Sequence, residues 1–294
     1  MPLTHTTAFK IRHYECDAYG HVNHANYLRY MQEAAFEASA AAGYDFSRYD
    51  ALGSLWLVRD TDVEYLRPLR YGDTVVVTTW VADFQRVRSR RAYELRRDSD
   101  GEVVARAVTD WAYLDAASGR PARIPPAMVE RFMAGGPAPW STLPPRARFP
   151  EPPPPPPQPV IAHRVVEWRD LDPLRHVNNA VYLAYMEEAG VAAPPAFGWP
   201  LERLIEQGVG IFMRRVRVEY REPALLGDEL AISTYLSGVR NASGLRHYAI
   251  TRPADGALLA RGLAQWAFVD LRTGQPRRAP QGMVEDFAGH ISAG

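Results

Sequence analysis

The pattern of hydrophobic and polar residues predicts one strand, one long helix and four further strands early in the chain. Phe9–Glu15 is strand-like, and the Ala-rich stretch Ala25–Ala42 has apolar residues at helical spacing, with Gly43 placed to end it. Pro125–Phe132 predicts a short closing helix. Runs rich in Val, Thr, Tyr and Trp predict strands at 55–66, 74–83, 89–97 and 103–115. Their short connections favour antiparallel pairing, which describes a sheet wrapped around a helix.

The same pattern occurs twice. Asp17-Ala-Tyr-Gly-His21-Val-Asn23 returns as Asp172-Pro-Leu-Arg-His176-Val-Asn178, a displacement of 155 residues (172 minus 17) that needs no insertion or deletion. A repeat of this length is about one small domain. The sequence therefore predicts an α+β protein of two tandem domains, at residues 1–134 and 160–294, joined by residues 135–159.

Prolines mark the expected linker and one expected difference between the copies. An unbroken proline row, Pro152–Pro157, predicts a polyproline-II connection that is long enough to cross a domain face and belongs to neither core. Pro194 and Pro195 predict that the second long helix stops near Ala193, whereas the first continues to Gly43. We therefore expect the two domains to differ in shape along one wall.

Composition excludes several classes of protein. The formal net charge of zero argues against a general nucleic-acid binder. Cys16 is the one cysteine, so the chain forms no internal disulfide, and no apolar run is long enough to cross a bilayer. With no signal-peptide pattern at its start, the sequence predicts a cytoplasmic protein without membrane or nucleic-acid partners.

Chemistry-bearing residues gather just before each long helix. Asp17 and Asp172 could act as a general base on water or as a nucleophile, or could order the loop. His21 and His176, with Asn23 and Asn178, could orient a substrate or hold the loop by hydrogen bonds. The unpaired amides of the first helical turn could stabilise an oxyanion.

Other catalytic devices are missing or are not repeated. The sequence has no Gly-x-Ser-x-Gly elbow, and Cys16 is matched by Leu171 in the second copy. His21 and His24 could form a metal pair, but the second copy has Asn179 in place of His24. We therefore expect no metal and no cofactor.

This order of elements, with Asp-x-x-Gly-His-Val-Asn-x-x-x-Tyr before the helix, resembles the hotdog-fold acyl-CoA thioesterases of the 4-hydroxybenzoyl-CoA thioesterase type. The second copy, from Trp168 to Asn179, is also similar to plant acyl carrier protein thioesterases. The resemblance implies hydrolysis of an acyl thioester to free acid and CoA, with the backbone amides of His24 and Asn179 as oxyanion donors. Because sites in this family form between two subunits, it also implies an intramolecular pseudo-dimer of the tandem hotdog domains. Further homodimerisation stays open.

The substrate implied is an acyl-CoA, or an acyl carrier protein thioester. Cations that could bind CoA phosphates are abundant, because every basic residue except Lys10 is arginine. The candidates are Arg88, Arg90, Arg91, Arg123, Arg240, Arg246 and Arg278. Two alternatives remain, a hydratase or dehydratase on the same fold and a non-catalytic acyl-CoA binder. The catalytic motif of the hydratases is not found here, and the chain has no segment left for an output module.

Overall fold

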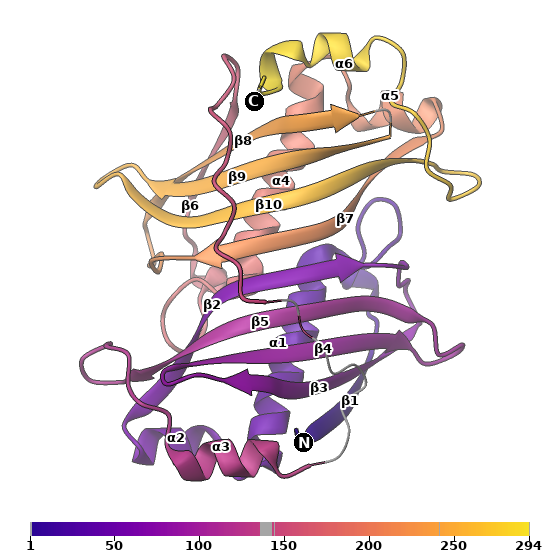
Figure 1. Cartoon of the computed structure of the whole chain (residues 1–294). Coiled ribbons are helices and arrows are strands. Elements are labelled where there is room, and N and C mark those ends of the chain that lie inside the picture. Colours follow the sequence, from indigo (N-terminus) through magenta and orange to yellow (C-terminus); the bar gives the residue numbers. More distant parts are fainter. Residues whose placement is uncertain (1, 136–142, 144, 241, 294) are drawn as a thin grey trace. The chain divides into compact units, whose positions relative to one another are not determined.

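A computed structural model describes residues 2–135, 143, 145–240 and 242–293 (Figure 1). The chain divides into two compact units, Met1–Ala147 and Arg148–Gly294. The division falls within the segment predicted as the linker, part of which (136–142 and 144) lies outside the described residues.

Unit 1 is an antiparallel sheet with a long helix against one face (Figure 1). Its strand order is β1-β3-β4-β5-β2. The elements in chain order are β1 (Thr4–Lys10), η1 (His13–Glu15), α1 (His24–Ala41), α2 (Phe46–Ala51), β2 (Ser54–Tyr65), β3 (Thr74–Phe84), β4 (Arg88–Arg97), β5 (Val103–Asp115) and α3 (Pro126–Met133).

Unit 2 repeats this architecture with the strand order β6-β8-β9-β10-β7. Its elements are β6 (Val160–Val165), η2 (Trp168–Asp170), α4 (Asn179–Ala196), α5 (Leu201–Glu206), β7 (Val209–Tyr220), β8 (Glu229–Arg240), β9 (Ser243–Arg252), β10 (Ala257–Asp270), α6 (Met283–Asp286) and η3 (Ala288–His290). The long helices α1 and α4 match residue for residue at the displacement of the sequence repeat.

Alanines allow α1 to lie close to the sheet. Ala34, Ala35 and Ala38 are buried together with Leu28 and Met31, which form the apolar stripe expected from the sequence. The sheet contributes alternate residues of each strand, which follows from the two-residue period of a strand. The core of each unit therefore lies between its long helix and the inner face of its sheet.

The four predicted central strands of unit 1 are confirmed, each within a residue of its expected bounds. The predicted position of the first strand, Phe9–Glu15, is wrong. β1 begins at Thr4 and pairs with β3 from Thr4↔Trp80 to Lys10↔Thr74, and a 3-10 turn follows at His13–Glu15. The short helices α2 and α5 were not predicted.

The predicted stop of the second helix near Ala193 is also wrong. α4 continues to Ala196, with Pro194 and Pro195 in its last turn. There each proline removes one backbone hydrogen bond near the helix end, and the carbonyl groups of both prolines accept bonds from the amides of residues 197–199. Both long helices therefore contain 18 residues, and helix length gives no difference between the units.

The second half of the predicted linker packs onto unit 2 instead of lying apart from its core. Phe149 is only 6% exposed, and its ring lies 4.6 Å from the guanidinium of Arg261. Tyr235 Oη donates a hydrogen bond of 2.6 Å to the carbonyl of Pro153. Polyproline-II backbone has no internal hydrogen bonds, so its carbonyl groups are available to such side chains. Figure 1 shows this segment running over the sheet of unit 2.

Candidate functional site

The loop before each long helix is folded around its aspartate. In unit 1, Asp17 Oδ1 accepts hydrogen bonds from the amides of Tyr19 (2.8 Å) and His21 (3.1 Å). In unit 2, Asp172 Oδ1 accepts one from the amide of Leu174 (2.9 Å). Each carboxylate thus orders its loop through one oxygen. In the described part of unit 1, Oδ2 of Asp17 accepts no hydrogen bond, so this atom is available to a water molecule.

Burial shifts the pKa values of two groups in these loops. It raises the pKa of the Asp172 carboxyl above its ordinary value of 3.8, and hydrogen bonds from the amides of Leu174 and His176 partly oppose this effect. Burial also lowers the pKa of His21, against the attraction of Asp17 and together with the repulsion of Arg70. A carboxylate with a raised pKa is a stronger base, and a neutral histidine can donate and accept hydrogen bonds.

Asparagines cap both long helices. Asn23 Oδ1 accepts from the amide of Ala25 (3.0 Å), and its backbone carbonyl accepts from the amide of Asn26 (3.0 Å). Unit 2 repeats these bonds through Asn178, at 2.9 Å each. The cap therefore satisfies the second and third amides of the helix and leaves the first amide to another acceptor.

That first amide belongs to His24 in α1 and to Asn179 in α4. No acceptor for the Asn179 amide is found among the residues that the structure describes. A tyrosine from the sheet fixes the same turn. Tyr65 Oη donates to the carbonyl of His24 (3.3 Å), and Tyr220 Oη donates to that of Asn179 (3.1 Å). In unit 2, the N-terminus of α4 thus presents the Asn179 amide at a fixed position in the field of the helix dipole.

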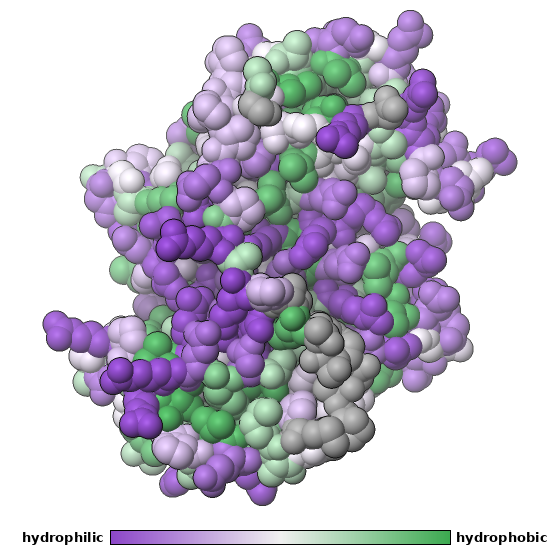
Figure 2. Space-filling view, in the orientation of Figure 1, coloured by the Kyte–Doolittle hydropathy of each residue, from purple (hydrophilic) through white to green (hydrophobic). Residues whose placement is uncertain are grey.

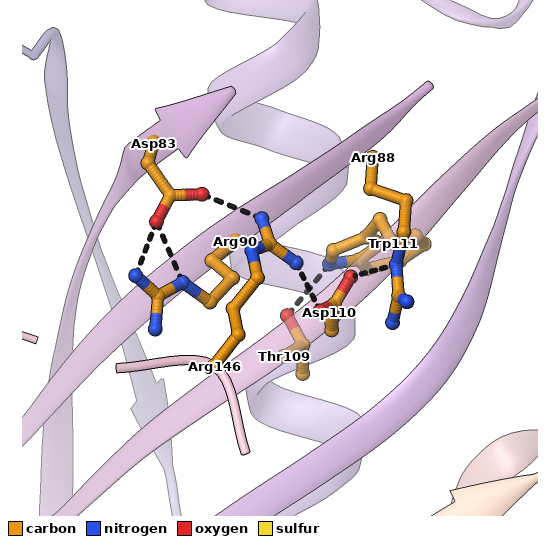
Figure 3. Close-up of polar contacts among 7 residues, drawn as sticks. All are labelled: Asp83, Arg88, Arg90, Thr109, Asp110, Trp111 and Arg146. Atoms are coloured by element: carbon orange, nitrogen blue, oxygen red, sulfur yellow. Dashed lines mark hydrogen bonds and ion pairs between the residues drawn. The ribbon is translucent and has the colours of Figure 1, made fainter. Parts of the chain in front are cut away.

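Two of the candidate phosphate-binding arginines form ion pairs on the outer face of unit 1 (Figure 3). Arg88 Nε donates to Asp110 Oδ1 at 3.0 Å, and Arg90 Nε donates to Asp83 Oδ2 at 2.6 Å. Arg146 joins both carboxylates, a contact that sequence reasoning missed. Figure 2 shows hydrophilic residues spread over much of this face. Arg88 and Arg90 are thus partly neutralised before any ligand binds.

The remaining arginines fall into two groups. Arg91 and Arg246 are each only 6% exposed, so neither side chain offers an exposed cation to a CoA phosphate. The side chains of Arg123, Arg240 and Arg278 are exposed and form no ion pair with any residue of the described ranges. These three stay candidates for binding phosphate.

The described residues contain neither a metal-binding cluster nor a membrane-spanning helix. Among the described residues, no three His, Cys, Asp or Glu side chains are grouped so that they could hold a metal ion. Within the same residues, no helix is both long and apolar enough to span a membrane.

The sequence was compared with known protein families. The Thioesterase-like superfamily matches residues 11–132 and again residues 166–287, which covers most of both units. The chain belongs to this superfamily. The expected tandem pair of hotdog thioesterase domains is thereby confirmed.

Individual relatives of the chain are also named as thioester hydrolases. Long-chain acyl-CoA thioesterase FadM of Escherichia coli is 32% identical over 106 residues, which is 35% of this chain and 77% of that protein. The chloroplastic acyl-[acyl-carrier-protein] hydrolase FATB2 of Cuphea viscosissima is 25% identical over 268 residues, which is 88% of this chain and 61% of that protein. The chain is thus similar to the first relative over about a third of its length and to the second over most of its length.

A solved structure supports the fold. The 12:0-ACP thioesterase from Umbellularia californica superposes with a TM-score of 0.69, over 93% of this chain and 94% of that chain, at 20% identity. At this identity the similarity concerns the fold alone. It extends over both units, as expected for a tandem duplication of the hotdog domain.

Proposed function

We propose that this protein hydrolyses acyl thioesters, with CoA or acyl carrier protein as the thiol, to the free acid and the thiol. One observation carries the proposal: in each unit, a loop aspartate precedes a capped helix whose first amide is left over by the cap. A carboxylate base and an oxyanion donor are the two groups that thioester hydrolysis requires. Membership of the Thioesterase-like superfamily supports the same reaction.

Asp17 and Asp172 act as general bases in this proposal. The carboxylate takes a proton from water while the water oxygen attacks the thioester carbonyl. The amide of His24 or Asn179 donates to the oxyanion, and collapse of the tetrahedral intermediate breaks the C–S bond and releases a thiolate that gains a proton. Direct attack by the carboxylate, which forms an anhydride that water then cleaves, is the alternative path.

The histidines and arginines have supporting parts. His21 and His176 hold the loop and face the reacting water, and Asn23 and Asn178 act through the cap. Among the candidate arginines, Arg123, Arg240 and Arg278 would meet the CoA phosphates, because they are exposed and form no ion pair within the described ranges.

The test is thiol release from a panel of acyl-CoA and acyl carrier protein thioesters. We compare the wild type with the double variant Asp17→Asn, Asp172→Asn, which keeps the loop-ordering oxygen and removes the base. We expect kcat to fall about 10²–10⁴-fold, the usual contribution of a general base, while the variant stays folded and binds acyl-CoA.

Three outcomes separate the alternatives. Retention of more than about a tenth of wild-type kcat would overturn the assignment of the carboxylates. Binding of acyl-CoA without release of thiol from any substrate would support the non-catalytic binder. Hydration of an enoyl-CoA without thiol release would support the hydratase.

A further inference from the structure

The interior of unit 1 has hydroxyl groups where unit 2 has hydrocarbon. Ser39 of α1 shares a hydrogen bond of 2.8 Å with Tyr49 of α2, and Tyr113 of β5 donates one of 2.7 Å to Ser54 of β2. At the displacement of the repeat, the matching residues of unit 2 are Pro194, Leu204, Phe268 and Val209. Several of these belong to an apolar core cluster. The fold of this domain therefore does not require hydroxyl groups here.

A second part of this polar layer lies on neighbouring strands. The hydroxyl groups of Tyr93 and Thr109 are 3.1 Å apart, and Trp111 Nε1 donates to Thr109 Oγ1 at 2.6 Å (Figure 3). Unit 2 has Ala264 in place of Thr109. Buried polar groups are costly unless paired, and these hydroxyl groups satisfy one another, so the interior of unit 1 holds a polar layer without the cost of an unpaired hydroxyl group.

The guanidinium of Arg91 lies among these groups without a carboxylate. It donates a long bond of 3.4 Å to Thr79 Oγ1, and it lies 5.8 Å from the centroid of the Phe132 ring. In the described part of the chain, no acidic side chain is within ion-pair distance of Arg91. A guanidinium has five N–H donors, and a buried charge without a counter-charge is strongly unfavourable.

The matching arginine of unit 2 has the acceptor that Arg91 lacks. Arg246 Nη1 lies 3.2 Å from His290 Nε2, and His290 Nδ1 lies 3.0 Å from the carbonyl oxygen of Gln158. Because a carbonyl only accepts, Nδ1 carries the proton and Nε2 accepts from Arg246. Unit 1 has Gly135 at the position of His290 and hence no side chain there.

We propose that unit 1 binds an acyl group carrying an oxygen acceptor remote from the thioester, and that Arg91 binds this oxygen. A carboxylate is the preferred acceptor, because it also balances the buried charge. The inference rests on the proposed thioesterase function and names its substrate class.

The position of Arg91 along the helix fits an acceptor far from the thioester. In unit 2, a Cβ on Gly190 would lie 3.6 Å from Arg246 Cδ, so the arginine lies beside that turn of α4. The matching residue of α1 is Ala35, which at 1.5 Å per residue is about 16 Å from His24. Only an extended acyl group reaches that far from the helix N-terminus.

The first experiment uses the wild-type protein. CoA thioesters of matched chain length, ending in a methyl, a hydroxyl or a carboxylate group, are compared by kcat/KM in a thiol-release assay over a series of lengths. We expect the carboxylate series to exceed the methyl series by roughly 10- to 100-fold at its best length, the range for one hydrogen bond to a charged group. Equal or faster turnover of the methyl series at every length overturns the inference, whether or not any variant folds.

Variants test whether Arg91 causes the preference for the carboxylate series. Arg91→Met should abolish the carboxylate preference, and Arg91→Lys should retain part of it. Arg246→Met is the matched control, because it removes the corresponding guanidinium in unit 2, and it should leave the preference ratio unchanged. Loss of the preference in Arg246→Met alone would contradict the assignment to unit 1.

A binding measurement with free acids tests this inference without any hydrolysis, and therefore separately from the proposed function. Thermal unfolding is measured with a free dicarboxylic acid and with the monocarboxylic acid of the same length. A larger rise in Tm with the diacid, lost in Arg91→Met, is expected. If no thioester is hydrolysed, the proposed function fails, and this measurement still decides whether Arg91 binds the acceptor.

Discussion

Replacing Asp172 by Asn should separate chemistry from folding in unit 2. The Asn side chain keeps an oxygen for the bond from the Leu174 amide, so the loop keeps its hydrogen bond. It also removes a charge whose burial raises the pKa of the carboxyl above 3.8. We therefore expect the free energy of unfolding at neutral pH to rise, or to stay within about 1 kcal/mol of wild type, while unit 2 loses its base.

The pH dependence follows from the sign of this shift. Because the folded state holds the proton of Asp172 more tightly than the unfolded state, this group stabilises the wild type at low pH. That contribution is lost as pH rises through the raised pKa. The stability advantage of Asp172→Asn should thus be absent below pH 3.8 and grow above it. Urea unfolding across this range and kcat/KM at each pH measure the two effects.

Asp255 offers a control, because its pKa is lowered whereas that of Asp172 is raised. This exposed turn residue accepts from the amide of Ala257, and the hydrogen bonds from Arg252 lower its pKa. The Asp255→Asn variant should therefore have a slightly lower free energy of unfolding than the wild type, and its turnover should be unchanged. If Asp172→Asn instead lowered stability by more than about 1 kcal/mol and kept wild-type turnover, Asp172 would be a loop-ordering residue and nothing more.

Three further predictions concern the helix cap, the linker and the pairing of the units. Asn178→Ala should lower the free energy of unfolding by about 1 kcal/mol, because it removes the cap bond to the Ala180 amide, whereas Asn178→Asp should restore it in urea unfolding. Arg146→Ala should cost about 1–3 kcal/mol, since it breaks hydrogen bonds to two carboxylates, while Arg148→Ala, an exposed neighbour, should stay within about 0.5 kcal/mol. The pseudo-dimer stays a prediction: after cleavage within residues 136–144, the fragments should elute together from a native sizing column, and separate monomers would contradict it.

The fold could be predicted because its signals are long and repeated. β5 has the bounds that its pattern of Val, Ala and aromatic residues indicated, and the duplication gave each element a second appearance. β1 was misplaced because Thr4–Lys10 is a half-exposed edge strand whose residues are mostly polar, so its period-2 signal is weak. The two proline residues of α4 were misjudged because a rule for helix interiors was applied to a last turn.

The arrangement of the candidate site could be predicted only in part. The aspartates and the capping asparagines were visible because both copies place them at the same offset before a helix. The burial of Arg91 and the ion pairs of Arg146 were not visible, because the chain uses arginine for nearly all its positive charge. Which arginine is enclosed and which is exposed depends on tertiary packing, for which the local sequence carries no signal.

The duplication also serves as an internal comparison of what each part of the domain is required to do. The aspartate, the asparagine cap and the tyrosine bond to the first helical carbonyl recur in both units with nearly the same geometry. The interior diverges, from hydroxyl groups and an arginine without a carboxylate in unit 1 to hydrocarbon and an arginine paired with His290 in unit 2. Groups that perform one reaction must keep their geometry, whereas groups that surround an acyl chain can change with its chemistry. A difference in substrate between the two units should therefore be sought in the layer between helix and sheet.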